Sequence, residues 1–226
     1  MTPAILLARG VDHVVVDKPA GILVHRTKLS SDTEAMLGRV RDTVGQWVYA
    51  VHRLDRATSG CLLFGLSSEG VPYLQQALRD GQKEYLALVR GQADSLHDTV
   101  IDRPLKVKNK LKKAATHIEV LGSSAEPRCS LLRARPLTGR FHQIRRHLAG
   151  TGHPILGDSS HGDTRVNRTW REQRGLDRLA LHCFRLELPL LEGLSTVRSP
   201  IPSSLREVLD ALPFTAGLHE ELGPHP

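Results

Sequence analysis

Short apolar runs rich in β-branched residues, separated by turn-forming residues, dominate the chain and predict strands. They lie at residues 3–8, 13–16, 48–51, 61–66, 83–89, 116–121, 130–134 and 179–188. Patterns with apolar positions every three or four residues predict helices between these runs. The expected helices are one with a Ser31–Glu34 capping box and an end at Gly45, one with apolar positions 71, 74 and 78 and an end at Gly81, one over 143–149, and one with a Ser204–Glu207 capping box.

The order of these elements predicts the fold class. Strands and helices alternate too irregularly for a doubly wound parallel sheet, so we expect an α+β fold: a mixed, mainly antiparallel sheet with peripheral helices. No linker or internal repeat divides the sequence, and residues 1–212 are expected to form one domain. Residues 213–226, rich in Gly, Pro and Glu, are expected to be a flexible tail.

Charge and composition narrow the choice of partner. The chain has 226 residues and a formal net charge of +7, which favours a polyanionic partner but can also merely aid solubility. Aromatic residues make up only 4%, which argues against an extensive base-stacking surface. No apolar stretch approaches the roughly 20 residues of a membrane helix and no export signal is evident, so we expect a cytoplasmic protein that binds no membrane. Cys61, Cys129 and Cys183 lie in apolar segments and are expected to be reduced core residues.

The most informative polar segment is HRLDRATSG, residues 52–60, which lies between two predicted strands. It places Asp55 between Arg53 and Arg56 on a short connection, a common way to present a reactive carboxylate. The alternative is a plain tight turn in which Thr58 and Ser59 bond the backbone.

This segment resembles the catalytic motif of the RluA-type pseudouridine synthases. Further segments resemble that family's other motifs, in the same order: DKPAG at 17–21 followed by Val24 and His25, KEYLALV at 83–89, GRFHQIRRHL at 139–148, HPILGD at 153–158 and LH at 181–182. Several ordered motifs are a specific signal, whereas any one of them alone would be weak.

The resemblance implies the pseudouridine synthase catalytic fold, without an S4 RNA-binding domain because the motifs begin almost at residue 1. The doubled Arg145-Arg146 and the segment 157–163 are most similar to the branch of the family that modifies uridine 65 of tRNA. The implied partner is therefore tRNA, bound by a monomer. A ribosomal RNA target remains the alternative, because the segment 100–115 is short and Lys-rich.

The implied chemistry breaks the C1′–N1 bond of uridine, turns the uracil and rejoins it through C5. The resemblance makes Asp55 the nucleophile or base and places Arg145 beside it, where a guanidinium offsets the cost of burying a carboxylate. Attack at C1′, attack at C6 and removal of the C2′ proton all remain open. This reaction requires no cofactor and no metal.

A uridine in a stem must leave the stack before it can react, at a cost of a few kcal/mol. The resemblance implies that Arg53 fills the vacated space, that Tyr85 lies against the flipped uracil, and that Leu181 packs the other side of the pocket. A strand aromatic and a plain core residue are the simpler interpretations of Tyr85 and Leu181.

Basic residues outside these roles suit RNA phosphates, although a solvated face explains them equally well. Arg140 and Arg146 flank the 141–145 segment; a Lys-rich run covers 106–113; and Arg165, Arg168, Arg171, Arg174 and Arg178 recur at three- or four-residue spacing, where a helix would align them. The supporting residues implied by the motifs are His52, Thr58, Gly60 and His142. The twelve His residues show no ligand spacing that predicts a metal site.

Two functions of other classes compete with the synthase. A non-catalytic RNA-binding protein on the same fold would not need Asp55, Tyr85 and Arg145 together. A hydrolase with Asp55 as its nucleophile should show a second acid–base carboxylate in sequence context, and none stands out.

Overall fold

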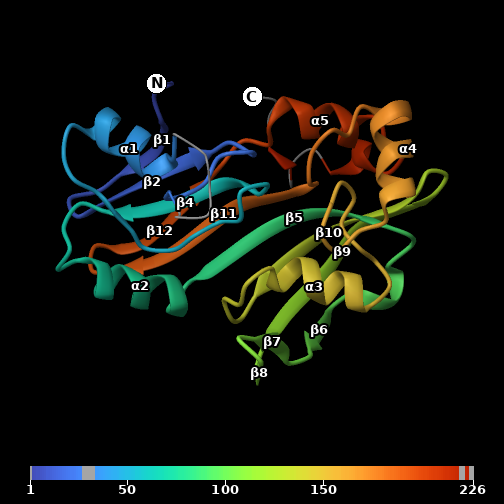
Figure 1. Ribbon diagram of the computed structural model, residues 1–226, viewed down its shortest axis with the longest axis horizontal. Helices are drawn as coiled ribbons and strands as arrows, with labels where there is room; N and C mark the ends of the chain where they lie inside the picture. Colours follow the sequence, from blue (N-terminus) through green and yellow to red (C-terminus); the bar gives the residue numbers. More distant parts are fainter. Residues whose placement is uncertain (1, 27–33, 219–221, 224–226) are drawn as a thin grey trace. The chain divides into compact units, whose positions relative to one another are not determined.

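The structure, a computed structural model, describes residues 2–26, 34–218 and 222–223. Contacts divide the chain into two compact units (Figure 1): unit 1 contains Met1–Lys83 and Cys183–Ser199, and unit 2 contains Glu84–His182 and Pro200–Pro226. Two of the crossings between the units fall inside strands, β5 (Gln82–Arg90) and β11 (Leu181–Leu190). The domain expected over residues 1–212 thus has an internal division that no linker sequence marks.

The strands of unit 1 are in the order β1 (Ile5–Arg9), β2 (His13–Lys18), β4 (Ser59–Gly65) and β11, with β3 (Tyr49–Ala50) on β4 and β12 (Gly193–Arg198) on β11. The pairs β1–β2, β2–β4, β3–β4 and β11–β12 are antiparallel. The helices of this unit are α1 (Met36–Val44) and α2 (Val71–Asp80). Every residue of β4 is buried, as expected of a central strand with apolar side chains on both faces. The segment 52–60 leads directly into this strand.

Unit 2 has a second set of antiparallel strands, in the order β5, β10 (Arg128–Pro136), β9 (Ala115–Ala125) and β6 (Thr99–Asp102). A separate hairpin pairs β7 (Leu105–Val107) with β8 (Lys110–Lys112). The helices are α3 (Gln143–Gly150), α4 (Thr164–Arg174) and α5 (Ser203–Asp210), with short 3₁₀ turns at Asp94–Leu96 and Thr215–Gly217. Helix α3 packs on β9 and β10 (Figure 1). The mainly antiparallel α+β class is confirmed.

Most predicted elements are present, with bounds that differ by a few residues. Gly45 ends α1 in the left-handed conformation, as expected. Gly81 ends α2 for another reason: its backbone is extended, and an added Cβ would lie 1.9 Å from the carbonyl oxygen of Glu187. The strands β6, β7, β8 and β12 were not predicted. All three Cys are buried and outside any disulfide, as expected, and burial raises the pKa of Cys129 to about 11.

Neither α1 nor α5 begins with a side-chain cap hydrogen bond from its N-cap residue. The residue before α1 is Ala35, which makes no side-chain cap, and the Glu34 carboxylate pairs with Arg39 at 2.6 Å; Ser31 lies outside the described residues. The box at Ser204 is wrong, because α5 begins one residue earlier and follows Pro202, with no side-chain cap bond.

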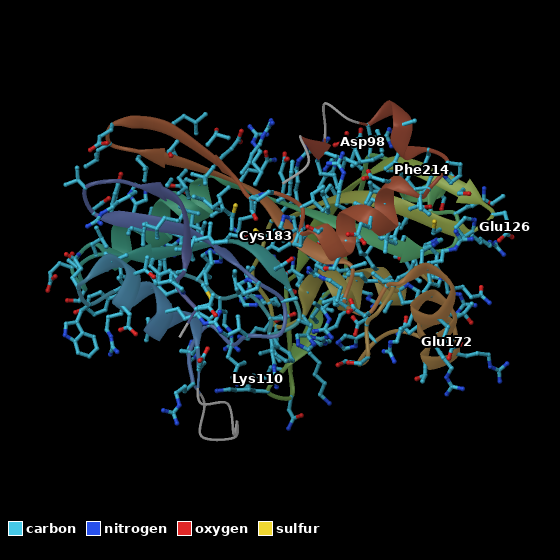
Figure 2. The ribbon with its side chains drawn as sticks, turned by 90° about the horizontal axis from the view of Figure 1, so that it is seen from above. Asp98, Lys110, Glu126, Glu172, Cys183 and Phe214 are labelled. Carbon is cyan, nitrogen blue, oxygen red and sulfur yellow. The ribbon has the colours of Figure 1, made fainter. Side chains whose placement is uncertain are left out.

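The expected flexible tail is packed where it is described. A Cβ on Gly122 would lie 2.5 Å from the ring of Phe214, the residue labelled in Figure 2. Leu222 is buried, and Arg206 donates to the carbonyl of Gly223 at 2.8 Å. These apolar and hydrogen-bonded contacts hold the described part of the segment 213–226 against unit 2.

Gly60 provides a test of the strand packing around the segment 52–60. Its φ is +111°, and an added Cβ would lie 2.2 Å from the carbonyl oxygen of Cys183. We expect Gly60→Ala to lower the free energy of unfolding by about 2–5 kcal/mol, through backbone strain and overpacking. Gly45→Ala, at φ +79° with open space around the Cβ, should cost only about 1–2 kcal/mol. Equal losses in urea unfolding would show that the close approach to Cys183 is unimportant.

Candidate active site

The segment 52–60 is fastened in unit 1 by a buried ammonium group. Lys18, at the end of β2, has no exposed surface, and its Nζ donates to the carbonyls of Pro19 at 2.9 Å, Arg56 at 3.1 Å and Thr58 at 2.7 Å. An ammonium offers three donors, and hydrogen bonds from a charged donor are stronger than neutral ones. The Lys of the DKPAG motif thus holds the backbone on the C-terminal side of Asp55.

The DKPAG turn also binds the segment directly. The Gly21 amide donates to the carbonyl of Arg56 at 2.8 Å, and Nε of Arg56 donates back to the carbonyl of Gly21 at 2.9 Å. The Thr58 amide closes a turn on the carbonyl of Asp55 at 3.1 Å. In the plain-turn alternative the Thr58 hydroxyl would bond the backbone, but its buried Oγ1 has no hydrogen-bond partner among the described residues.

Asp55 is half-buried in this fastened segment, and Arg53 is exposed. His52 supports the segment from the other side, since its Nε2 accepts the Leu63 amide hydrogen at 3.1 Å. Burial, with a smaller effect from the charge of Lys83, lowers the pKa of His52 to about 3. The imidazole is therefore neutral near pH 7 and serves as an acceptor that ties residue 52 to β4.

Tyr85 and Leu181 belong to unit 2 and are buried, with exposed fractions of 8% and 3%. Tyr85 is on β5 opposite Ala134, and Leu181 begins β11. Burial agrees with the simpler interpretation of Leu181 as a core residue. The roles of both residues at a flipped uracil stay predictions.

Arg145 on α3 is 5% exposed and binds Asp158, which is 1% exposed. Its Nε and Nη2 each donate to one carboxylate oxygen at 2.8 Å, a two-point geometry that fixes the plane of the guanidinium. This pair uses two of the five N–H donors of the guanidinium. Asp55 lies in unit 1 and Arg145 in unit 2, and their pairing stays a prediction.

The pKa of Asp158 is lowered by opposing effects that do not cancel. Burial acts to raise it, but the hydrogen bond from Arg145, the amides of Ser160 and His161 and the Arg145 charge act more strongly to lower it. Asn167 holds the same turn, accepting from the Gly157 amide and donating to the carbonyl of Asp158, both at 2.9 Å. Asp158 is thus an ionised anchor for Arg145.

Gln143 organises the chain that leads into α3. It is buried; its Oε1 accepts from the Thr138 hydroxyl and the Arg140 amide, and its Nε2 donates to the carbonyl of Ala115. His142, predicted as a hydrogen-bonding support, places its Nδ1 3.0 Å from Nε2 of His161. These contacts fix the residues directly before Arg145.

Arg140 and Arg146 lie on this same segment. Arg140 is exposed, and its Nε donates to the carbonyl of Lys113 at 3.0 Å. Lys113 follows the exposed β7–β8 hairpin, whose tip Lys108–Asn109 has positive φ at both residues; Lys110 of this hairpin is labelled in Figure 2. Arg146 is half-buried, and its Nη1 donates to the carbonyl of Phe141 at 3.4 Å. Arg140 thus contacts the backbone where the Lys-rich segment 106–113 ends.

The predicted basic stripe is only partly correct. Four of its five arginines are on α4, where Figure 2 labels Glu172, but Arg178 lies beyond the helix end at Gly175. Residues three apart drift by about 60° around a helix, so Arg165 and Arg174 project about 180° apart. The four arginines are exposed and wrap around the helix instead of forming one stripe.

Arg174 faces a pocket of about 510 Å³ within unit 2. Arg90, Arg128, His153 and Trp170 also line it. Arg168 and Arg171 do not line this pocket, and they project about 120° and 60° from Arg174 around the helix axis.

Among the described residues, no group of three or more His, Cys, Asp or Glu side chains could hold a metal ion. None of the described helices is long and apolar enough to cross a bilayer.

The prediction from sequence missed three positioning residues: Lys18, Gln143 and Asp158. Each stands inside a quoted motif, so the signal was present. Lys18 and Gln143 bind carbonyls of other segments and Asp158 binds the Arg145 side chain, and only the fold brings these partners within reach.

Comparison with known proteins agrees with this arrangement. A family model described as RNA pseudouridylate synthase matches residues 12–150. Because this match covers more than half of the chain, the chain belongs to the RNA pseudouridylate synthase family, which confirms the resemblance to pseudouridine synthases.

Individual relatives are closer still. The chain is 43% identical to tRNA pseudouridine synthase C of Salmonella typhi over 199 residues, 77% of this chain and 76% of that one. It is 36% identical to tRNA pseudouridine synthase C of Vibrio cholerae over 231 residues, covering 92% and 94%. The solved structure of human RNA pseudouridylate synthase domain containing 4 has a similar fold, with a TM-score of 0.76 at 22% identity, covering 91% and 92%.

Asp158 should make the free energy of unfolding depend on pH in the acidic range. Its folded pKa is lowered, so its stabilisation is complete above the unfolded value of about 3.9 and is lost as the pH falls toward the folded value. We expect Asp158→Asn to lose about 3–5 kcal/mol near pH 7, because Arg145 keeps a buried charge without its carboxylate. In urea unfolding from about pH 5 to pH 2.5, the variant should lose stability less steeply than the wild type. Asp177→Asn, an exposed aspartate of the same unit, should keep the wild-type slope; an unchanged slope for Asp158→Asn would contradict the assignment.

Proposed function

We propose that this protein isomerises a uridine of tRNA to pseudouridine, at position 65, with Asp55 as the nucleophile or base. The observation that carries the proposal is the fastening of Asp55: a half-exposed carboxylate on a segment held by Lys18, Gly21 and His52. A reacting group must be held near its productive geometry, and these bonds fix the backbone on both sides of it. The relatives named tRNA pseudouridine synthase C support tRNA as the substrate.

The other residues take the roles that the motifs imply. Arg145, oriented by Asp158, supplies positive charge that favours an ionised Asp55. Tyr85 contacts the uracil and helps to move the C5 proton. Arg53, which is exposed, fills the gap in the stem, and Leu181 completes the pocket wall. The protein acts as a cytoplasmic monomer, without a metal, cofactor or membrane.

The nucleophile assignment is tested on RNA. Unmodified tRNA and ribosomal RNA are incubated with the protein in the presence of EDTA, and pseudouridine is mapped by carbodiimide-blocked reverse transcription. We expect a stop at uridine 65 of tRNA with the wild type and with Asp42→Asn, an exposed aspartate of α1. Asp55→Asn should give no stop, because an amide is neither a nucleophile nor a base here.

Other outcomes have distinct meanings. An active Asp55→Asn variant would refute the role of Asp55. Stops only in ribosomal RNA would favour the ribosomal RNA synthase, whereas RNA binding without any stop would favour a non-catalytic RNA-binding protein.

The arginines of α4 that line the pocket and those that do not can be told apart by the salt dependence of tRNA binding. We propose that Arg168 and Arg171 contact RNA phosphates, so their double change to Ala should weaken tRNA binding and reduce the slope of log K against log salt by about one per lost contact. Arg128→Ala with Arg174→Ala removes the same charge from the pocket side. A reduced slope for this second pair alone would show that the RNA follows the pocket side instead.

A further inference from the structure

Phe141 is an exposed aromatic residue in a chain that has few aromatic residues. It is 60% exposed, and it directly precedes the residue that caps α3. One face of its ring is covered: the imidazole of His142 stacks on it, with centroids 3.7 Å apart and planes at 20°. With one face covered and most of the side chain exposed, the other face of the ring is open to solvent.

The ring is held in place by its neighbours. His142 has a φ of +52°, and its Nδ1 lies 3.0 Å from Nε2 of His161, with the two rings nearly perpendicular. The His161 amide in turn donates to Asp158 at 3.0 Å. The stack is therefore tied to the carboxylate that orients Arg145. Because the Phe141 side chain is already held in place, it loses little conformational entropy when a ligand binds the ring.

The surroundings indicate the ligand. Arg140 and Arg146 lie within five residues on either side, and Arg146 donates to the carbonyl of Phe141. A flat apolar surface beside guanidinium groups suits a nucleobase with its phosphates, because bases stack on aromatic rings irrespective of sequence. We propose that Phe141, supported by His142, stacks on a nucleobase of the bound tRNA. This proposal rests on the proposed function for the choice of RNA.

The chain offers a matched control. Leu137 is 63% exposed and lies four residues earlier in the same unit, but its side chain is aliphatic. A general loss of apolar surface would affect Leu137→Ala and Phe141→Ala alike. Stacking requires the ring, so it should distinguish Phe141→Leu from Phe141→Trp.

The experiment measures the Kd for a tRNA transcript and the rate of pseudouridine formation at saturating tRNA. We expect Phe141→Ala and Phe141→Leu to raise Kd by about 5-fold to 150-fold, the range for loss of one stacked base. The rate at saturating tRNA should stay near that of the wild type. Phe141→Trp and Leu137→Ala should bind like the wild type, and urea unfolding should show that all four variants remain folded.

Either of two results would overturn the proposal: an unchanged Kd for Phe141→Ala, or a Phe141→Leu variant that binds as well as the wild type. Because tRNA binding is measured separately from pseudouridine formation, failure of the proposed function can be distinguished from failure of the stacking proposal. A wild type that binds tRNA but forms no pseudouridine would refute the function and leave the stacking test readable.

Discussion

The buried ammonium of Lys18 is the interaction on which the geometry of the 52–60 segment depends. Moving a charge out of water is costly unless its hydrogen bonds are replaced, and here backbone carbonyls replace them. Two of those carbonyls belong to the segment itself, so burial of the charge and the course of the backbone stabilise each other. Without the ammonium, the buried Thr58 would lose its 2.7 Å carbonyl hydrogen bond and the Arg56 carbonyl would keep only the Gly21 amide, so Asp55 would lose its fixed position.

Unit 2 also contains a buried charge that is bound to main-chain groups, but this charge is negative. The carboxylate of Asp158 accepts backbone amides from its own turn and two bonds from Arg145. In both units, a buried charge bound to main-chain groups stands next to the residue that the reaction would use. Main-chain groups are present whatever side chain a residue carries, so they form dependable partners for such an anchor.

The sequence predicted the strongly apolar central strands and missed short strands that bury at most one apolar side chain each. The runs in β2, β4 and β5 are strongly apolar, whereas β8 is fully exposed and its hairpin turn has none of the usual Asn-Gly or Asp-Gly signal. The motifs located the candidate site residues, but the contacts of Lys18 and Gln143 join segments far apart in sequence. On any helix, the spacing of three residues makes Arg165, Arg168, Arg171 and Arg174 drift around the axis. The bounds of α4, which leave Arg178 outside the helix, come only from the structure.

The HRLDRATSG motif contains two kinds of residue: residues that the fold requires, such as Gly60, and residues that the reaction would use, such as Asp55. The close approach of the Cys183 carbonyl excludes any side chain at that position, whatever the protein does with RNA. Gly60, like Lys18, would therefore be kept by a relative that had lost its activity but kept its fold. A sequence search that scores the whole motif therefore finds relatives that share only the fold as readily as relatives that share the catalytic activity. To decide which relatives are enzymes, one should examine the position of Asp55 separately from the positions that the sheet requires.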